Sequence, residues 1–570
     1  MHSTMNRFTR PLASTRWPWR ELAAWFALAL LVRAITLALV TQPGYMDASY
    51  YYHVAENLVA GRGLVTDAVW NFLDSRTDLP RPSNAYWPPG TSLVAAVGGW
   101  LFGPGFRSAQ VPMVLLSAAM VPIAYLYGRL LLGTRRGGHG VAALVLCSAA
   151  YYPYWVTTDT FTPYGLLGAS SFLLLGYALC SRNMSRPWLV GLVIGAGVLA
   201  GWSQIVRPDG LLLATVIVVT AAVIGWRRLT HHLAASLQGG RAGAFPGRGP
   251  GGGGWGQWRS MVLWAGVAAA GYLLGASPWY VRNWLTWGSP LPMAGGQTIF
   301  LRRFDDIFAY GMEVSPAALV ADGWSLVFTG RLAGLIGNLV PLFQIALFVL
   351  APLAALGVRR LWRQPAARPA LLYVGVLYVA MSLAFPTTSP RGSLFHALTP
   401  ALPVLYAAMI RGVDTAVAWT SAWRRWNLAE ARAVFLAAVI MFQIGVAGYL
   451  AWQFRVVRGW EVPIAQAAAG WLDEHAAPGE PALFVDPPAF AVVARRPAVM
   501  VPSNSVEALL TVAQRFRAPW LILGPRGMRI AGRLYLDRVN DAQFEWMADI
   551  GEARVYRVRL VASAVTQSGD

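Results

Sequence analysis

Apolar stretches dominate the chain, and many of them are long enough to cross the hydrocarbon core of a membrane. A helix needs about 20 predominantly apolar residues for such a crossing. Of the 570 residues, 56% are hydrophobic, and the mean hydropathy of the sequence is +0.46. The pattern predicts an α-helical polytopic membrane protein.

The hydropathy pattern indicates about eleven transmembrane helices. They are expected near residues 22–41, 109–132, 140–156, 163–180, 188–206, 209–226, 260–279, 333–357, 370–386, 394–411 and 432–453. The first span carries Arg33 near its middle. A charge at that depth is expected to face the helix bundle or a buried acid, and we assign it no role.

The net charge of +20 comes from arginines, most of which lie in short segments between the spans. In a soluble protein this charge would suggest a nucleic-acid partner. In a membrane protein it reports orientation, because cytoplasmic loops are enriched in basic residues. One frame places every Arg-rich short loop inside, with the N-terminus cytoplasmic in a plasma (inner) membrane and no nucleic-acid partner. It requires residues 88–103 to form an interfacial helix, and this segment is short for a span.

The same frame divides the chain into two domains. Residues 1–455 form the transmembrane domain. It contains a first external loop with juxtamembrane helices at 42–105, a Gly-rich cytoplasmic linker at 227–259 and an external loop at 280–332. Residues 456–570 predict a small extracytoplasmic α/β domain. Its helices are expected at 461–475 and 506–516, and its strands at 482–486, 498–502, 520–524 and 553–560.

Asp47 lies among aromatic residues directly after the first span, in the sequence GYMDASYY (residues 44–51). An ionised side chain at the membrane boundary is costly unless water, a partner or a function stabilises it. The flanking tyrosines allow partial desolvation, which makes a carboxylate more basic. We therefore expect Asp47 to act as a general base. The alternative is a solvated acid that caps the helix beginning at Ser49.

Four spaced stretches together carry a family resemblance. They are DASYY (47–51) with AENL (55–58) and GRG (61–63), YWPPG (86–90), RPDG (207–210), and SPW (277–279) with RN (282–283) and GSP (288–290). In this order they resemble the membrane glycosyltransferases of the GT-C class, specifically the family 39-like branch of protein mannosyltransferases and aminoarabinose transferases. The resemblance covers roughly the first 290 residues well and the later spans loosely.

The resemblance implies transfer of a sugar from a polyprenyl-phosphate carrier to an acceptor hydroxyl at the extracytoplasmic face. The enzyme would contact membrane lipid and act in the cell envelope. It also implies an acid in the first external loop as the base, and Asp47 occupies that position. Protein mannosyltransferases typically carry an Asp-Glu pair there, whereas this chain has Asp47-Ala48. The departure leaves the acceptor open between protein, glycan and lipid, and the sequence does not identify the sugar.

Four candidate ligands for the donor phosphate lie at external ends of spans. A guanidinium group suits this task because its planar fork binds two oxygens and stays charged. The candidates are Arg207, Arg282, Arg391 and His396. For each Arg the alternative is an interaction with lipid headgroups, and for His396 it is a structural role at a helix start.

Candidate substrate-binding residues lie in the same external loops. Tyr50, Tyr51 and Trp87 can stack on sugar faces, although aromatic residues are also expected in any interfacial belt. Asp159 can position an acceptor or pair with an Arg, and its alternative role is to cap the helix that begins near Phe161.

A monophosphate leaving group carries less charge than a diphosphate, so Arg can stabilise it without a divalent ion. We expect no obligatory metal or other cofactor, and attack opposite the phosphate inverts the anomeric centre. Two other readings stay open. A transporter or flippase of lipid-linked sugars would share the headgroup arginines, but the sequence shows no internal repeat. An oligosaccharyltransferase-like enzyme would carry a Trp-Trp-Asp triplet, which this sequence lacks.

Overall fold

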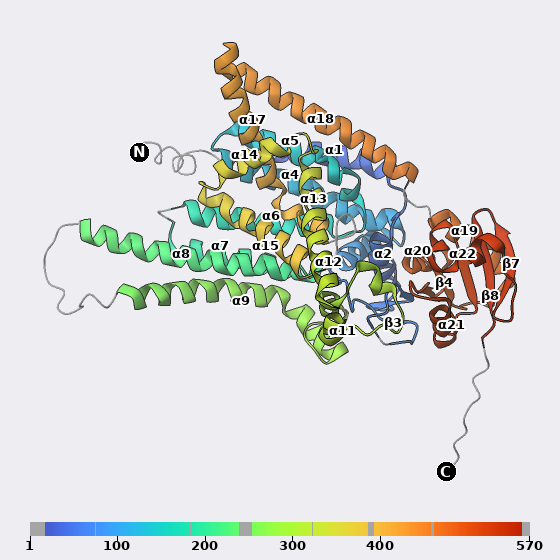
Figure 1. The fold of residues 1–570 in the computed structure, drawn as a ribbon. Helices are drawn as coiled ribbons and strands as arrows, with labels where there is room; N and C mark the ends of the chain where they lie inside the picture. Colours follow the sequence, from blue (N-terminus) through green and yellow to red (C-terminus); the bar gives the residue numbers. More distant parts are fainter. Residues whose placement is uncertain are drawn as a thin grey trace.

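The computed structural model describes residues 17–74, 76–181, 184–238, 253–321, 323–385, 393–457 and 461–560. Two parts are visible in Figure 1, a large helical body and a smaller α/β domain at its right-hand end.

Within the described residues, ten helical segments are long and apolar enough to cross a membrane. The chain is therefore a multi-pass membrane protein. The spans are formed by α1 (Trp19–Leu39), α4 (Phe106–Leu132), α6 (Phe161–Cys180), α7 (Arg186–Val206), α8 (Gly210–Gln238), α9 (Gly253–Trp287), α12 (Trp324–Gly337) with α13 (Leu339–Ile345), α15 (Arg368–Leu383), α17 (Leu402–Arg424) and α18 (Leu428–Val457).

Ten spans rather than about eleven are found because the expected helix at 140–156 is broken. Helix α5 (Arg135–Cys147) has only 13 residues, and a 3₁₀ segment, η3 (Ala149–Val156), follows it. The break lies at Ser148, which has φ −10° and ψ 78°, and whose hydroxyl accepts a hydrogen bond of 2.7 Å from Trp155 Nε1. Pro153 lies within η3 and cannot donate a backbone hydrogen bond.

The expected span at 333–357 is also wrong in its boundaries. The span runs over Trp324–Ile345, and a separate helix, α14 (Ala351–Leu361), follows it. Leu347 and Phe348 have φ values of 52° and 57°. Residues in this left-handed conformation interrupt a right-handed helix, so the span and α14 cannot form one continuous helix. The loop after α9 consequently ends before Trp324. Its short elements are α10 (Met293–Gln297), η4 (Thr298–Phe300), η5 (Phe304–Phe308) and α11 (Pro316–Ala321).

Helices α7 and α9 run side by side in close backbone contact (Figure 1). A Cβ atom on Gly197 or Gly201 of α7 would clash with the carbonyl oxygen of Ala268 or Tyr272 of α9. Small residues four positions apart permit such close helix packing in membranes. The contact fixes the C-terminal end of α7, where Arg207 follows the last helical residue.

The loop between α1 and α4 holds two shorter helices. Helix α2 (Met46–Val59) follows α1 closely, and α3 (Gly90–Phe102) is a 13-residue apolar helix, too short to span. Leu93, Trp100 and Phe102 of α3 are exposed, whereas a Cβ on Gly99 would lie 2.5 Å from a methyl carbon of Val59 in α2. This division into an apolar exposed face and a packed face is as expected for an interfacial helix.

The C-terminal α/β domain contains a six-stranded sheet in the order β2-β5-β4-β6-β8-β7. The strands β2, β5, β4 and β6 are parallel, and β8 and β7 complete the sheet antiparallel. The bounds of the strands are β4 (Ala482–Phe484), β5 (Ala498–Met500), β6 (Trp520–Leu523), β7 (Phe544–Ile550) and β8 (Ala553–Val558); those of the helices are α19 (Glu461–His475), α20 (Pro487–Ala494), α21 (Val506–Arg515) and α22 (Met528–Asp537).

The edge strand β2 (Ala68–Val69) belongs to the loop between α1 and α4. It pairs with β5 through Ala68 and Ala498, so the loop and the C-terminal domain share one sheet. Nearby, β1 (Val65–Thr66) pairs with β3 (Arg81–Pro82) inside the loop. The domain is therefore built from residues 461–560 together with a strand from the loop that carries Asp47.

Candidate active site

Asp47 lies in the first turn of α2, shortly after the C-terminal end of α1. Tyr45 is the N-cap residue in an extended conformation, and no side chain caps the helix. A carboxylate in the first turn is stabilised by the partial positive charge of the helix N-terminus. The side chain of Asp47 is 31% exposed, so it can be reached by a substrate.

Asp159 approaches from the loop between η3 and α6 and is almost completely buried, with 1% of its side chain exposed. It accepts a hydrogen bond of 2.5 Å from the hydroxyl of Tyr45 and another from the backbone N–H of Thr160. Burial alone would raise the pKa of Asp159, but His396 and these two donors outweigh burial and hold the pKa below its usual range. Asp159 is therefore a buried anion at neutral pH.

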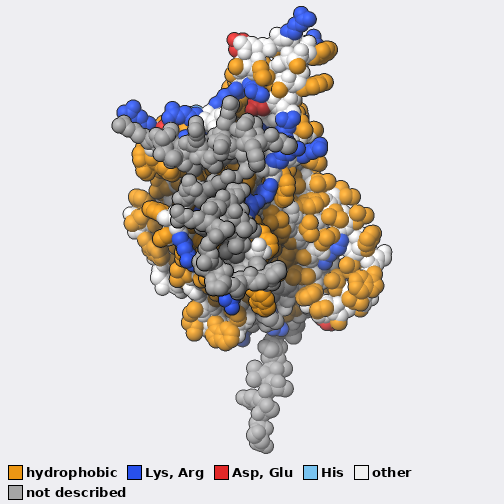
Figure 2. Space-filling model, turned by 90° about the vertical axis from the view of Figure 1, so that its left-hand side faces the viewer, with side chains coloured by type: hydrophobic (Ala, Val, Ile, Leu, Met, Phe, Trp, Pro, Cys, Tyr) orange, Lys and Arg blue, Asp and Glu red, His pale blue; other side chains and the backbone are white. Residues whose placement is uncertain are grey.

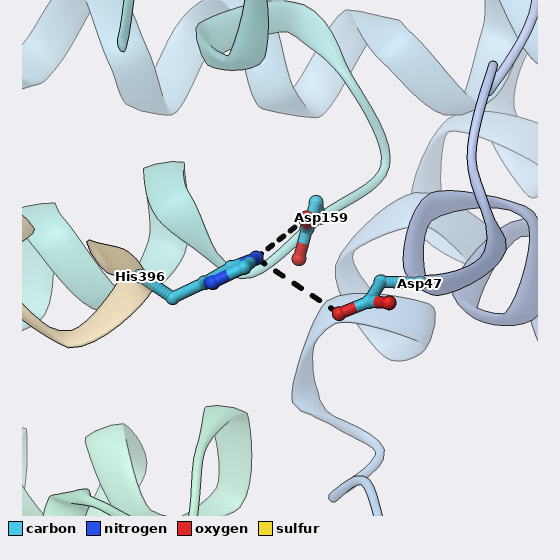
Figure 3. Close-up of side chains that lie close together, drawn as sticks. All are labelled: Asp47, Asp159 and His396. Carbon is cyan, nitrogen blue, oxygen red and sulfur yellow. Dashed lines mark ion pairs between the residues drawn. The ribbon is translucent and has the colours of Figure 1, made fainter. Parts of the chain in front are cut away.

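His396 connects the two acids. It lies in α16 (Ser393–Ala397), and its Nε2 atom is 3.4 Å from Asp159 Oδ2 and 3.9 Å from Asp47 Oδ2 (Figure 3). Its ring stacks on Phe161, with the ring centroids 4.2 Å apart. Three segments that are distant in the sequence thus place two carboxylates and one imidazole around a common point.

Arg207 is linked to this cluster through Thr160. The hydroxyl of Thr160 accepts a hydrogen bond of 3.1 Å from Arg207 Nη1, while its N–H donates to Asp159. Arg207 also donates to Asp209 Oδ2 from Nε and Nη2, at 2.9 and 2.6 Å. The guanidinium group is therefore held beside the acid cluster, with its fork directed at Asp209.

Tyr51 is buried and Tyr86 is partly buried, and both interact electrostatically with Asp47 and Arg207. Burial raises the pKa of Tyr51 well above its usual value, and Asp159 and Asp47 raise it further while Arg207 lowers it. Burial also raises the pKa of Tyr86, with contributions from Asp47 and Asp209. Both hydroxyls stay protonated at neutral pH and are available as hydrogen-bond donors.

Arg282 belongs to a neighbouring group around Tyr50. It donates to the carbonyl of Ser83 at 2.6 Å, and Tyr50 accepts a hydrogen bond of 2.8 Å from the N–H of Asn84. Burial raises the pKa of Tyr50 to about 12. The ring of Trp87 contacts both tyrosines, with centroids 5.0 Å from Tyr50 and 6.0 Å from Tyr51. These contacts give Tyr50 and Trp87 a packing role in the loop.

The candidates named from the sequence thus fall into three groups. Asp47, Asp159, His396, Arg207 and Tyr51 are brought together, while Arg282, Tyr50 and Trp87 form the adjacent group. Arg391 lies outside the described residues. Sequence reasoning missed Tyr45 and Thr160, although each is within two residues of a predicted acid. The hydrogen bonds from Tyr45 to Asp159 and from Arg207 to Thr160 join residues that are far apart in the sequence. A local sequence pattern does not predict such bonds.

The cluster can accept a proton, because one carboxylate is accessible and a second fixes the imidazole beside it. It can also hold a cation. One ligand atom each from Asp47, Asp159 and His396 lies within 4.8 Å of the others. Two carboxylates and an imidazole form a donor set suited to several divalent metals.

Solved structures with the same fold are membrane proteins. ArnT from Cupriavidus metallidurans bound to undecaprenyl phosphate is 14% identical, with 95% of this chain and 98% of that chain covered and a TM-score of 0.53. Its apo state gives 14% identity, 94% and 98% coverage and a TM-score of 0.54. The expected GT-C fold is therefore confirmed.

An oligosaccharyltransferase from Archaeoglobus fulgidus in the apo form is more distant, with 13% identity, coverage of 90% of this chain and 70% of that chain, and a TM-score of 0.49. No family model matches the sequence, and no curated protein is similar to it.

Proposed function

We propose that this protein transfers a sugar from a polyprenyl-phosphate carrier to an acceptor hydroxyl at the extracytoplasmic face of the plasma membrane. The observation that carries the proposal is the meeting of Asp47, Asp159 and His396 beside the N-terminus of α2. The fold adds support, because ArnT shares it and has been crystallised with undecaprenyl phosphate.

In the proposed step, Asp47 takes the proton of the acceptor hydroxyl. The acceptor oxygen bonds to the anomeric carbon while the bond from that carbon to the phosphate oxygen breaks, and the electron pair leaves with the polyprenyl phosphate. Attack opposite the phosphate inverts the anomeric centre. The proton on Asp47 then passes to water.

The two acids have different tasks because their environments differ. Asp47 is 31% exposed and can reach an acceptor, whereas Asp159 is 1% exposed and already accepts hydrogen bonds from Tyr45 and Thr160. Asp159 is a positioning residue that holds His396 at a fixed distance from Asp47. General-base catalysis of this kind contributes about 10²- to 10⁴-fold to a rate.

Arg207 is the best placed ligand for the departing phosphate, since Thr160 joins it to the acid cluster. Three of its five N–H donors are used in the hydrogen bonds to Asp209 and Thr160. Donors aimed at a developing charge stabilise the transition state strongly in a buried site. Arg282, Arg391 and His396 remain further candidates for the phosphate, and no divalent ion is required in this scheme.

The sidedness of the proposal can be tested by labelling. Single cysteines at Asp78 and Arg425, in a chain with Cys147 and Cys180 replaced by Ser, offer exposed positions at the two expected faces. In sealed right-side-out vesicles, an impermeant maleimide should label position 78 and leave position 425 unlabelled. The reverse pattern would place Asp47 on the cytoplasmic side and contradict the proposal.

Transfer is tested with purified protein in liposomes that contain a radiolabelled polyprenyl-phosphate sugar and a panel of glycan, lipid and peptide acceptors. The proposal predicts a labelled product with inverted anomeric configuration and an equal amount of polyprenyl phosphate. Movement of the intact carrier between leaflets without a product would indicate the flippase instead.

A further inference from the structure

A cavity lined by several arginines lies away from the acid cluster, between α14, α17 and α18. It has a volume of about 550 Å³ and is formed by the C-terminal part of α14, the middle of α17 and the start of α18. In Figure 1 α14, α17 and the start of α18 lie at the upper left, whereas the C-terminal domain lies at the right. The positive-inside frame makes this the cytoplasmic face.

The cavity is strongly basic. Its charged lining consists of five guanidinium groups and one carboxylate, a net formal charge of +4; these residues are Arg359, Arg360, Arg363, Arg411, Arg432 and Asp414. Figure 2, which views this end of the molecule, shows Arg side chains gathered in its upper part. Like charges in one partly desolvated cavity repel, so an anion bound among them is stabilised.

Some hydrogen-bond donors that line the cavity have no acceptor among the described residues. Arg432 Nε is buried without a hydrogen-bond partner among the described residues, and its nearest acid, Asp414 Oδ1, is 3.8 Å away. Arg411 donates to the carbonyl of Leu132 at 3.3 Å and has further N–H groups. The single carboxylate therefore leaves most of the arginine donors to solvent or a ligand.

The packing of the helices makes the cavity a defined site. Gly357 of α14 and Gly412 of α17 let the two backbones touch, because a Cβ on either would clash with a carbonyl of the other helix. Arginines from both helices are thereby held around one space instead of being scattered along a surface. Leu356 and Leu361 add an apolar wall, which suits an amphipathic ligand.

We propose that this cavity binds a phosphate-bearing anion, with the headgroup of an anionic phospholipid of the inner leaflet as the source that best matches its apolar wall. Arg forks bind phosphate oxygens in pairs, and basic pockets between transmembrane helices on the cytoplasmic side are suited to such headgroups. A free phosphate would use the same donors. The site is independent of the proposed transfer reaction.

The test compares two double variants of the full chain with equal changes of charge. Arg360→Gln with Arg363→Gln removes two exposed arginines of the cavity rim, and Arg424→Gln with Arg425→Gln removes two exposed arginines of α17 and its end that do not line it. Lipid retention is measured by native mass spectrometry with phosphatidylglycerol or phosphatidylcholine of identical chains. Inorganic phosphate is tested separately by its effect on the thermal unfolding temperature.

The proposal with a lipid source predicts two results. The wild type retains phosphatidylglycerol in preference to phosphatidylcholine, and this retention falls roughly 10-fold or more in the rim variant only. Stabilisation by inorganic phosphate with the same dependence on the variants, without selective lipid retention, would support the phosphate site with a soluble source. Equal losses in the two double variants, or no response to either probe, would overturn it.

Discussion

The hydroxyl of Tyr45 donates a hydrogen bond of 2.5 Å to Asp159, which lies 114 residues further along the chain. This bond ties the N-cap of α2 to the loop before α6, and both Asp47 and Asp159 lie near Nε2 of His396. The spacing of the two acids therefore depends on a tyrosine that does not itself need to touch a substrate.

Replacing Tyr45 by Phe should lower kcat by roughly 10-fold while leaving the fold intact. The variant removes one hydrogen bond to a buried carboxylate, and bonds to charged groups contribute about 1.5–3 kcal/mol. Steady-state transfer kinetics measure the effect, and Tyr449→Phe, at an exposed position of α18, is the matched control. An unchanged kcat would show that the orientation of Asp159 is not needed for turnover.

Removal of divalent metal ions by a chelator tests whether Asp47 acts as a general base or as a metal ligand. We expect full turnover after treatment with EDTA, because Arg207 can stabilise a monophosphate without an ion. If EDTA abolished turnover and Mn²⁺ or Zn²⁺ restored it, Asp47, Asp159 and His396 would have to be assigned as ligands. The role of Asp47 as general base would then be lost.

Asp486 should make the stability of the C-terminal domain depend on pH. Burial raises its pKa from 3.8 to about 7, and Glu461 and Asp47 raise it as well, although the N–H of Ala489 lowers it. The folded state therefore binds this proton more tightly than the unfolded state, and the free energy of unfolding falls as pH rises from about 4 to about 7.

The variant Asp486→Asn removes this dependence and keeps a side chain that can cap α20. Its unfolding temperature should exceed that of the wild type at pH 8 by about 4 °C or more and should be similar to it near pH 4. Scanning calorimetry at the two pH values provides the measurement, with the exposed Asp537→Asn as the control. A stabilisation that is the same at both values would argue against a titrating Asp486.

Arg33 is buried within the first span, with Nε and Nη1 lacking hydrogen-bond partners among the described residues. Its guanidinium group faces the rings of Tyr152 and Trp155, at 5.7 and 5.5 Å. Replacement by Met should leave turnover unchanged and maintain or raise the unfolding temperature, since a desolvated charge is exchanged for an apolar side chain. Loss of turnover in a folded variant would reveal a function for Arg33.

Much of the fold follows from local patterns in the sequence. Hydropathy located most of the spans, and α19 (Glu461–His475) has the bounds that its periodicity predicts. The break at Ser148 was missed because the sequence stays apolar on both sides of it, although the backbone changes there from an α-helix to a 3₁₀ segment. Strand β2 has only two residues, too few for any alternation, so its pairing with β5 could not be anticipated.

The candidate site was predictable as a set of residues but not as an arrangement. Asp47, Asp159 and His396 each follow or precede a span, and hydropathy does not define which span ends lie side by side. Their meeting depends on the packing of the helices and on bonds between loops, such as that of Tyr45 with Asp159. Arg282, which the sequence groups with Arg207, instead binds the carbonyl of Ser83.

The most direct test is the transfer rate of Asp47→Asn against that of Asp78→Asn in the same liposomes. Both variants exchange a carboxylate for an amide in the first external loop, and Asp78 is exposed. The account predicts a rate lower by about 10²- to 10⁴-fold for position 47 and an unchanged rate for position 78. A properly folded Asp47→Asn protein that transfers sugar at the wild-type rate would contradict it.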